Sequence, residues 1–140
     1  GRGPLNRNSS LWSSWAIKSS VVKIYFSGDS GYGSHLKKIG DDHGPFDISL
    51  IDCGQYNKAW KYSHMFPSEA IMASIDLKSE YFMPIHWGGF TLSMHPWDEP
   101  VIESKRIADE RGLNCLTPEI GEVISRKKLN KKFPSWWDQY

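Results

Sequence analysis

Apolar residues occur along the chain in short runs separated by glycine-rich or polar turns. Val21 to Ser27 is an apolar, β-branched and aromatic run that leads into the turn Gly28 to Gly33, as is typical of a buried strand. The alternation from Leu11 to Ile17, followed by a turn at Lys18-Ser19-Ser20, predicts an earlier strand and hence an opening hairpin. Further strands are predicted for Phe46 to Asp52, for Tyr81 to Ile85 and, as a short last strand, for Glu122 to Ser125.

Helical segments are predicted between these strands. Each starts at a capping residue or a proline, and two of them end at a glycine. The segments are Ser34 to Ile39, ended by Gly40; Pro67 to about Leu77; and Pro100 to Arg111, ended by Gly112. Strands that alternate with helices in this way predict an α/β layer.

Composition narrows the functions to be considered. A chain of 140 residues can bury one core, and a formal net charge of +1 gives no global field for nucleic acid or an anionic surface. No apolar run is long enough to span a bilayer, and no signal peptide is visible. Cys53 and Cys115 fit no metal or redox spacing, which favours two reduced thiols. We therefore expect one domain or half of a larger one, in the cytoplasm or at a membrane surface, without a nucleic-acid partner.

Two predicted strands end on residues that can bind a metal ion. Asp29 follows the first strand of the parallel layer, and His86 follows the run Tyr81 to Ile85. In an open α/β sheet, ligands collect at the carboxyl ends of the strands, where loops can aim side chains into a crevice. Each residue also has a purely structural reading, as a turn-forming aspartate or as a histidine at a strand end.

Five sequence blocks together point to a known family. In order they are Gly28-Asp29-Ser30-Gly31-Tyr32-Gly33, Gly44-Pro45-Phe46-Asp47, Gly54-Gln55-Tyr56, His64 with Pro67-Ser68-Glu69-Ala70, and Ile85-His86-Trp87-Gly88. They resemble the C-terminal half of the metallo-β-lactamase superfamily, and especially the branch of the N-acylphosphatidylethanolamine-hydrolysing phospholipase D and its bacterial relatives. The resemblance covers Leu11 to Leu116 and implies half of an αββα sandwich: an α/β fold with one mixed sheet and helices on one face. We expect this partial domain to occupy residues 1–125.

The resemblance also implies roles for individual residues. Asp29 resembles the carboxylate that bridges two metal ions, and His86 resembles the last metal ligand. His64 would contact a substrate phosphate or leaving group, and Tyr56 would line the same pocket, although a tyrosine in such a loop is just as often a packing residue. The implied parent enzyme hydrolyses a phosphodiester or related ester, such as an N-acylphosphatidylethanolamine-like phospholipid, with two ions that are most often Zn2+.

Other parts of the family pattern are absent. The motif histidine-x-histidine-x-aspartate-histidine does not occur in the chain, and Asp52 and Cys53 replace a usual proline-aliphatic pair. A catalytic zinc site usually takes about three protein ligands, whereas the matched positions supply Asp29 and His86 alone. We therefore expect a fragment that binds zinc weakly or not at all and does not hydrolyse substrate by itself.

Two alternatives stay open. In the first, the chain is a non-catalytic half-domain that pairs with a missing N-terminal half or with a second copy, because its sheet would otherwise be left bare. In the second and more distant one, Gly28-Asp29-Ser30 belongs to a GDS-type serine esterase with Ser30 as the nucleophile. That chemistry needs a histidine base, and the late aspartate-x-x-histidine of such esterases does not occur.

The segment 126–140 differs from the rest, because basic residues precede aromatic ones. Such an order suits a peripheral membrane contact, in which lysines meet anionic headgroups and tryptophans lie at the interface. The preferred interpretation is a solvated tail, or aromatic residues that pack on the missing N-terminal half. The residues concerned are Arg126, Lys127, Lys128, Lys131, Lys132, Phe133, Trp136, Trp137 and Tyr140.

Overall fold

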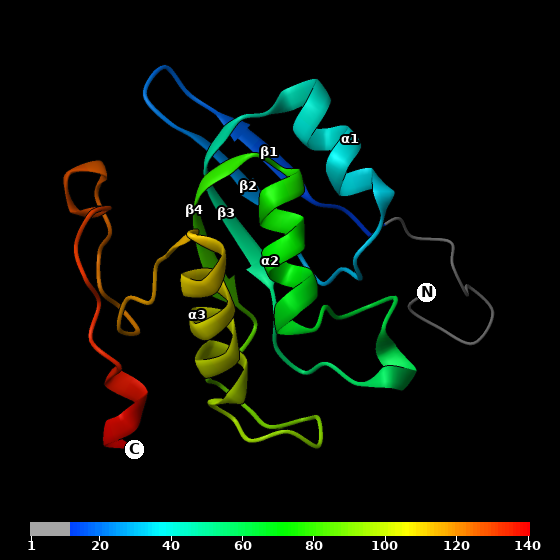
Figure 1. Cartoon of the computed structure of the whole chain (residues 1–140), viewed down its shortest axis with the longest axis vertical. Coiled ribbons are helices and arrows are strands. Elements are labelled where there is room, and N and C mark those ends of the chain that lie inside the picture. The colour runs from blue at the N-terminus through cyan, green and yellow to red at the C-terminus, as the bar shows by residue number, and fades with distance from the viewer. Residues whose placement is uncertain (1–11) are drawn as a thin grey trace.

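A mixed sheet with the strand order β1-β2-β3-β4-β5 forms the centre of the computed structural model, which describes residues 12–140 (Figure 1). The first two strands pair antiparallel as a hairpin, and the later neighbours pair parallel. The strands are β1 (Trp15–Lys18), β2 (Lys23–Phe26), β3 (Phe46–Asp52), β4 (Ser79–Ile85) and β5 (Asn114–Cys115).

The α-helices of the described residues lie together on one face of this sheet (Figure 1). They are α1 (Ser34–His43), α2 (Pro67–Asp76) and α3 (Glu99–Arg111), and each connects two neighbouring parallel strands. Such crossovers bring the carboxyl ends of β2, β3 and β4 to the same edge of the sheet. The expected α/β class, with one mixed sheet and helices on one face, is confirmed.

The main core lies between the sheet and these helices. Tyr25, Ile51 and Phe82 are fully buried together with apolar side chains of the helices, and each such side chain contributes about 1.5–3 kcal/mol on burial. The hydroxyls of Ser49 on β3 and Ser74 on α2 lie 2.7 Å apart inside this layer. This buried hydrogen bond ties α2 to the middle of the sheet.

The C-terminal segment covers part of the opposite face of the sheet. Leu129 packs with Tyr81 and Leu116 in a second apolar cluster, which Ile124 and Phe133 extend. Three short 3-10 helices occur in the described chain, η1 (Lys58–Trp60), η2 (Arg126–Lys128) and η3 (Trp136–Gln139).

The last helical turn, η3, is anchored by its tryptophans. Trp136 and Trp137 are buried against Val101 of α3, and Trp87 stacks on Trp136 at a centroid distance of 5.4 Å. Tyr140, by contrast, is 84% exposed. Segment 126–140 is thus packed on this domain through its two tryptophans, and a peripheral membrane contact stays a prediction that depends on its exposed lysines and Tyr140.

Two elements differ from the sequence-based prediction by more than a shift of a few residues at their ends. The first helix continues through Gly40 to His43, because Gly40 is needed for packing rather than for ending the helix: a Cβ there would lie 2.0 Å from the carbonyl oxygen of Asp76. The last strand is β5, which follows α3 after a short turn and pairs with β4, whereas the residues from Glu122 to Ser125 lie in irregular chain. Leu11, the predicted start of the hairpin, lies outside the described residues.

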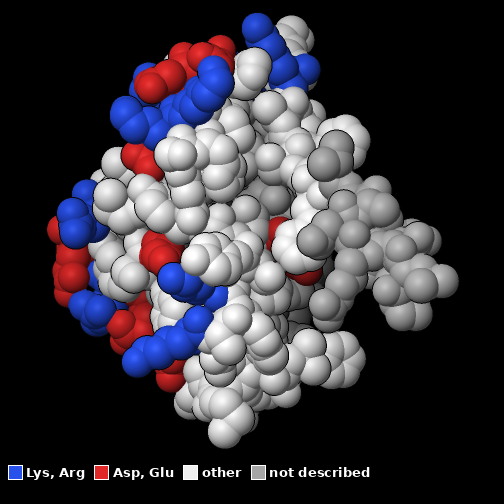
Figure 2. All heavy atoms as spheres, turned by 90° about the vertical axis from the view of Figure 1, so that its right-hand side faces the viewer, with Lys and Arg blue, Asp and Glu red and all other residues white. Residues whose placement is uncertain are grey.

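Charged side chains of both signs lie side by side on the face seen in Figure 2. Ion pairs four residues apart occur on the helices, with Lys38 and Asp42 on α1 separated by 2.6 Å and Lys105 and Asp109 on α3 by 3.5 Å. Within residues 12–140, none of the helices combines the length and the hydropathy that a membrane crossing would need.

Candidate metal centre

A side chain that could bind a metal ion lies at or just after the carboxyl end of each of the strands β2, β3 and β4. Asp29 follows β2 after Gly28, which has a φ of +61°, and Asp52 is the last residue of β3. His86 follows β4 directly, and His64 lies in the segment between η1 and α2. The edge of the sheet that the crossovers define is therefore lined by carboxylates and imidazoles.

These side chains form one cluster. One possible ligand atom from each of Asp52, His64 and His86 lies within 4.8 Å of the other two. The Nδ1 atom of His86 is 3.7 Å from Oδ1 of Asp29, and the His64 and His86 rings stack at 5.1 Å with 12° between their planes. Carboxylate oxygens and imidazole nitrogens at this spacing form a donor set that fits a divalent metal ion.

The cluster extends from solvent into the interior. The side chain of Asp29 is 62% exposed and that of His86 is 36% exposed, whereas the side chain of His64 is 17% exposed and that of Asp52 is fully buried. Asp29 and His86 are thus the members that an incoming ion meets first. Asp52 lies behind them, already engaged by protein donors.

The buried carboxylate of Asp52 is surrounded by hydrogen-bond donors. Its Oδ2 lies 2.9 Å from Nδ1 of His64 and accepts the backbone N–H of Ser30 at 3.4 Å. Its Oδ1 accepts the backbone N–H of Gly54 at 3.3 Å. Burial raises the pKa of the Asp52 carboxyl, and the hydrogen bond with His64 opposes that rise.

The backbone under the cluster is unusually constrained. His86 has a φ of +66°, a left-handed conformation that costs a residue with a side chain about 1–3 kcal/mol and is concentrated at functional sites. A Cβ on Gly54 would lie 1.9 Å from the carbonyl oxygen of His86. The exits of β3 and β4 therefore touch through their backbones, and this contact sets where the His86 ring emerges.

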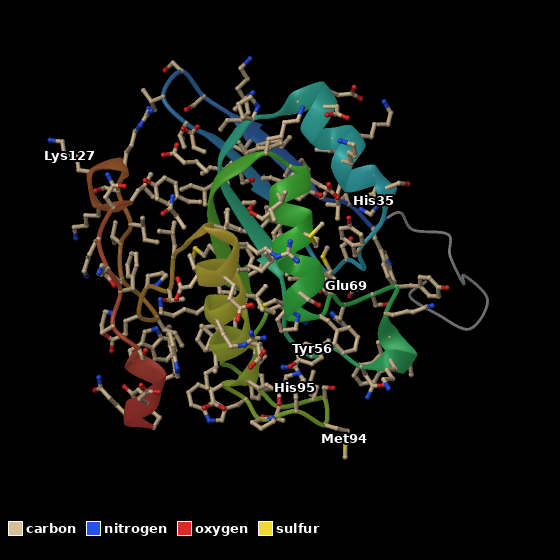
Figure 3. The ribbon with its side chains drawn as sticks, viewed as in Figure 1. His35, Tyr56, Glu69, Met94, His95 and Lys127 are labelled. Carbon is tan, nitrogen blue, oxygen red and sulfur yellow. The ribbon has the colours of Figure 1, made fainter. Side chains whose placement is uncertain are left out.

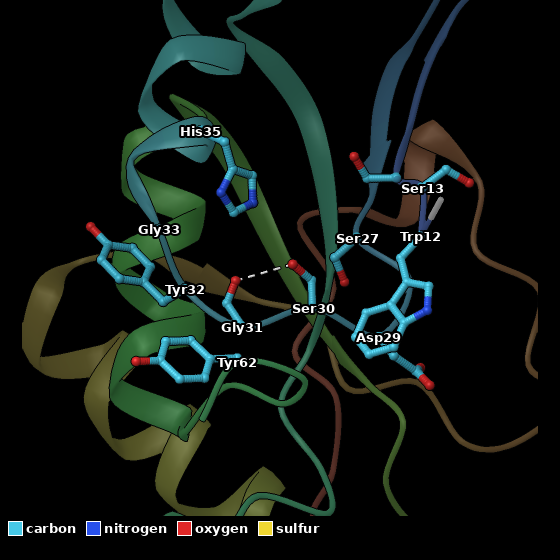
Figure 4. Close-up of a pocket in the computed structure, with 11 residues that line it drawn as sticks. Trp12, Ser13, Ser27, Asp29, Ser30, Gly31, Tyr32, Gly33, His35 and Tyr62 are labelled. Carbon is cyan, nitrogen blue, oxygen red and sulfur yellow. Dashed lines mark hydrogen bonds between the residues drawn. The ribbon is translucent and has the colours of Figure 1, made fainter. Parts of the chain in front are cut away.

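A pocket with a volume of about 300 Å3 opens beside Asp29 (Figure 4). Its walls carry the hydroxyls of Ser27 and Ser30, the imidazole of His35 and the rings of Trp12 and Tyr62. The Ser30 hydroxyl donates to the carbonyl oxygen of Gly31 at 3.1 Å. In the described structure this predicted esterase nucleophile therefore has a backbone carbonyl as its partner, not a histidine base.

Tyr56 makes a separate set of contacts. Its hydroxyl is hydrogen-bonded to Glu99 of α3, and its ring stacks on His95 at 4.2 Å and contacts Phe66 at 4.8 Å. Figure 3 shows Tyr56 and His95 next to each other near the N-terminal end of α2. The structure brings Asp29, His64 and His86 together, whereas a role of Tyr56 in substrate binding stays a prediction.

Asp52 is the member of the cluster that the sequence analysis did not assign to the site. Its only signal was a carboxylate at the end of a buried strand, where the resembled branch carries a proline. Burying a charged group at the end of a strand costs much free energy unless the group has hydrogen-bonding or charged partners. The free-energy cost of burying the Asp52 charge was therefore the one sign in the sequence that this carboxylate has a partner elsewhere in the chain.

Comparisons with a family model and with curated proteins assign the chain to the same family. Residues 1–87 match the model of the β-lactamase superfamily domain. An uncharacterized protein of Mycobacterium tuberculosis is 40% identical over 136 residues, which cover 95% of this chain and 36% of that protein. The N-acyl-phosphatidylethanolamine-hydrolyzing phospholipase D 1 of Caenorhabditis elegans is 32% identical over 130 residues, covering 87% of this chain and 36% of that protein.

A solved structure supports the same fold. Igni18, described as a novel metallo hydrolase from the archaeon Ignicoccus hospitalis, superposes with a TM-score of 0.64 at 20% identity over 84% of this chain and 47% of its own. The chain spans about a third of the length of the two curated relatives above. From the family match, the relatives and the fold, the chain belongs to the metallo-β-lactamase superfamily, in the branch of the N-acylphosphatidylethanolamine-hydrolysing phospholipases D.

Proposed function

We propose that this chain supplies one side of a divalent-metal centre in a hydrolase of phosphodiesters or related esters. The observation that carries the proposal is the meeting of Asp29 and His86 at the carboxyl-end edge of the sheet, after β2 and β4, with Nδ1 of His86 and Oδ1 of Asp29 3.7 Å apart. His64 stands directly beside them, stacked on His86. The family of the chain and the metallo-hydrolase neighbour support the same chemistry.

The roles of the residues follow from their positions. Asp29 and His86 are the proposed ligands, because they are the exposed members of the cluster. A divalent ion held by these residues, for which we propose Zn2+, would polarise a phosphoryl oxygen of the substrate and lower the pKa of a bound water molecule. His64, whose Nδ1 is engaged by Asp52, has Nε2 left to bond a phosphoryl or leaving-group oxygen.

The substrate proposed is a phospholipid of the N-acylphosphatidylethanolamine type. This class comes from the names of the relatives in Caenorhabditis elegans and Saccharomyces cerevisiae, which are 32% and 33% identical to the chain. Within the 140 residues, the matched positions contribute two metal ligands. We therefore propose that the remaining ligands come from another polypeptide segment, and that the chain alone binds Zn2+ weakly and does not hydrolyse substrate.

Zinc titration by calorimetry tests the ligand assignment. We compare the wild-type chain with Asp29→Ala and His86→Ala, and we use His43→Ala on α1 as a matched surface-histidine control. We expect weak binding by the wild type and the control, and at least about a tenfold loss of affinity in either site variant. Equal affinity in all four proteins would contradict the proposed site.

Hydrolysis of bis(p-nitrophenyl) phosphate with added Zn2+ tests the expected inactivity. We expect no turnover by the chain alone. Turnover that disappears in Asp29→Ala and His86→Ala would mean that the centre is complete within the chain or between two copies of it. In that case the proposal that the chain alone does not hydrolyse substrate would be wrong, although the ligand assignment would stand.

A further inference from the structure

We propose that Asp52 is a positioning residue for His64: it holds the Nδ1–H of the imidazole and thereby presents Nε2 to the mouth of the candidate metal centre. This inference rests on the proposed function, because it gives His64 its orientation toward a substrate oxygen. Its evidence is the geometry of the pair.

The surroundings of Asp52 decide which of the two groups, the Asp52 carboxylate or Nδ1 of His64, donates the hydrogen bond between them. Both carboxylate oxygens face backbone N–H groups, of Ser30 on Oδ2 and of Gly54 on Oδ1, and a backbone N–H can only donate. The carboxylate is therefore placed as an acceptor on both oxygens. Since Oδ2 lies 2.9 Å from Nδ1 of His64, that nitrogen is the one that carries the proton.

The strand end that holds Asp52 is itself fixed. The backbone N–H of Asp52 donates to the hydroxyl of Ser27 at 2.9 Å, which joins the ends of β3 and β2. The side chain is fully buried, so it has no room to change rotamer without leaving three donors unpaired. Asp52 is thus a rigid anchor behind a more exposed imidazole.

The ring of His64 is held from two further directions. His86 stacks on its face with 12° between the planes, and Trp60 makes an edge contact at 6.3 Å and 70°. Within residues 12–140, the hydrogen bond of this ring is the one at Nδ1, so Nε2 is the nitrogen left for a substrate oxygen. The tautomer of a neutral histidine follows from the hydrogen bond that its other nitrogen makes.

The consequence for the proposed hydrolase is a nitrogen with a fixed direction. In the neutral ring Nε2 accepts a hydrogen bond, and in the imidazolium it donates one, while Nδ1–H stays bonded to Asp52 in both forms. A substrate oxygen therefore meets the same atom in either state. Such a carboxylate behind an imidazole acts by orientation and does not itself touch the substrate.

The tautomer of His64 can be read directly by NMR. The wild-type chain is labelled with 15N-histidine, freed of metal with EDTA and studied at about pH 8, where an ordinary imidazole is neutral. Two-bond 1H–15N spectra distinguish Nδ1–H from Nε2–H, and His64→Gln assigns the signal. We expect the Nδ1–H form in the wild type and a loss of that preference in Asp52→Ala.

A matched control uses the other carboxylate of the cluster. Asp29→Asn alters the group 3.7 Å from Nδ1 of His86, so it should leave the His64 tautomer unchanged. A predominant Nε2–H form in the wild type would overturn the proposal, as would an unchanged tautomer in a folded Asp52→Ala protein. If Asp52→Ala does not fold, the wild-type spectrum still decides, because the proposal requires Nδ1–H there.

This test is separate from the test of the proposed function. It uses no metal and no substrate, so an Nδ1–H signal together with no zinc binding would refute the metal centre and leave the Asp52–His64 pair standing. Zinc binding that depends on Asp29 and His86, together with an Nε2–H signal, would do the reverse.

Discussion

At the scale of single residues, the candidate site depends on one contact between backbones. Gly54 follows β3 and touches the carbonyl of His86, whose own φ is +66°. A side chain at position 54 would therefore push on the residue that carries the proposed ligand. Gly54 therefore supports the site because it has no side chain that would displace His86.

We predict that Gly54→Ala destabilises the chain and weakens zinc binding together. The added Cβ would meet the His86 carbonyl oxygen at 1.9 Å, and overpacking of this kind costs about 1–3 kcal/mol. Urea unfolding and calorimetry measure the two effects. Gly89→Ala is the control, because a Cβ there meets no atom within 4 Å. Equal stability of the two variants would show that the strand exits can separate freely.

A second residue-scale prediction concerns pH. Burial raises the pKa of the Cys115 thiol from its ordinary value of 9.0 to about 12. Because the unfolded chain releases this proton from about pH 9 upward and the folded chain keeps it, the free energy of unfolding must fall as the pH rises. The loss from this group is up to about 1.4 kcal/mol between pH 8 and pH 10.

Urea unfolding of the wild type and of Cys115→Ala at both pH values measures this contribution. We expect the decline between pH 8 and pH 10 to be smaller in the variant. An identical decline in both proteins would mean that the thiol ionises as easily in the folded state as in the unfolded one.

The residues at strand ends show how far sequence reasoning reaches. Asp29 and His86 could be found because a strand pattern followed by a polar residue places that residue at the edge of the sheet. Asp52 could not be assigned in this way, because its role depends on a contact with His64, twelve positions away in the chain. Local patterns carry no information about such pairing.

At the scale of elements, the hairpin, the parallel strands and the three helices follow from the apolar pattern, but two boundaries do not. Gly40 looks like a helix end in the sequence, yet it lies inside α1 where that helix approaches Asp76 at the end of α2. The strand β5 is two residues long and pairs with β4 at Tyr81 and Phe82. Both features are decided by a neighbouring element, which a single-sequence pattern does not show.

The element η3 gives a prediction about the C-terminal segment. Trp137 is buried against Val101 and its aromatic neighbours, so Trp137→Ala should cost about 3–5 kcal/mol, as deletion of a buried aromatic ring does. Thermal unfolding followed by circular dichroism measures the change. Tyr140→Ala, at an exposed position of the same segment, should leave the melting temperature nearly unchanged. A neutral Trp137→Ala would show that the segment is not part of the folded domain.

At the scale of the whole molecule, the face of the sheet away from the helices is apolar and only partly covered. The pairing register places Ile17, Ile24, Ile48 and Tyr81 in one row across the strands, and Trp15, Phe26, Leu50 and Met83 in the next. The C-terminal segment covers the rows at Tyr81 and Met83. Within residues 12–140 this cover does not extend over β1, where Ile17 and Trp15 are 54% and 62% exposed.

We expect this bare end of the sheet to associate, either with a second copy or with the polypeptide that supplies the remaining ligands. Exposed apolar surface of this kind is a common mark of an interface, and among the strands of residues 12–140 β1 is an edge strand, whose outer backbone groups pair with none of the other strands. Sedimentation equilibrium of the isolated chain should therefore show a mass that rises with concentration. Trp15→Lys combined with Ile17→Lys should shift the chain to the monomer, because two charges would then have to be buried at the interface.

Phe90→Lys is the control, since Phe90 is an exposed aromatic residue in irregular chain and belongs to none of the strands. If this variant abolishes association as well as the double variant does, the contact is not at β1. A monomer at every concentration would exclude pairing of copies through this face. If association and tight zinc binding are lost together in the double variant, the ligands missing from one copy must come from the other, because neither Trp15 nor Ile17 can bind the metal itself.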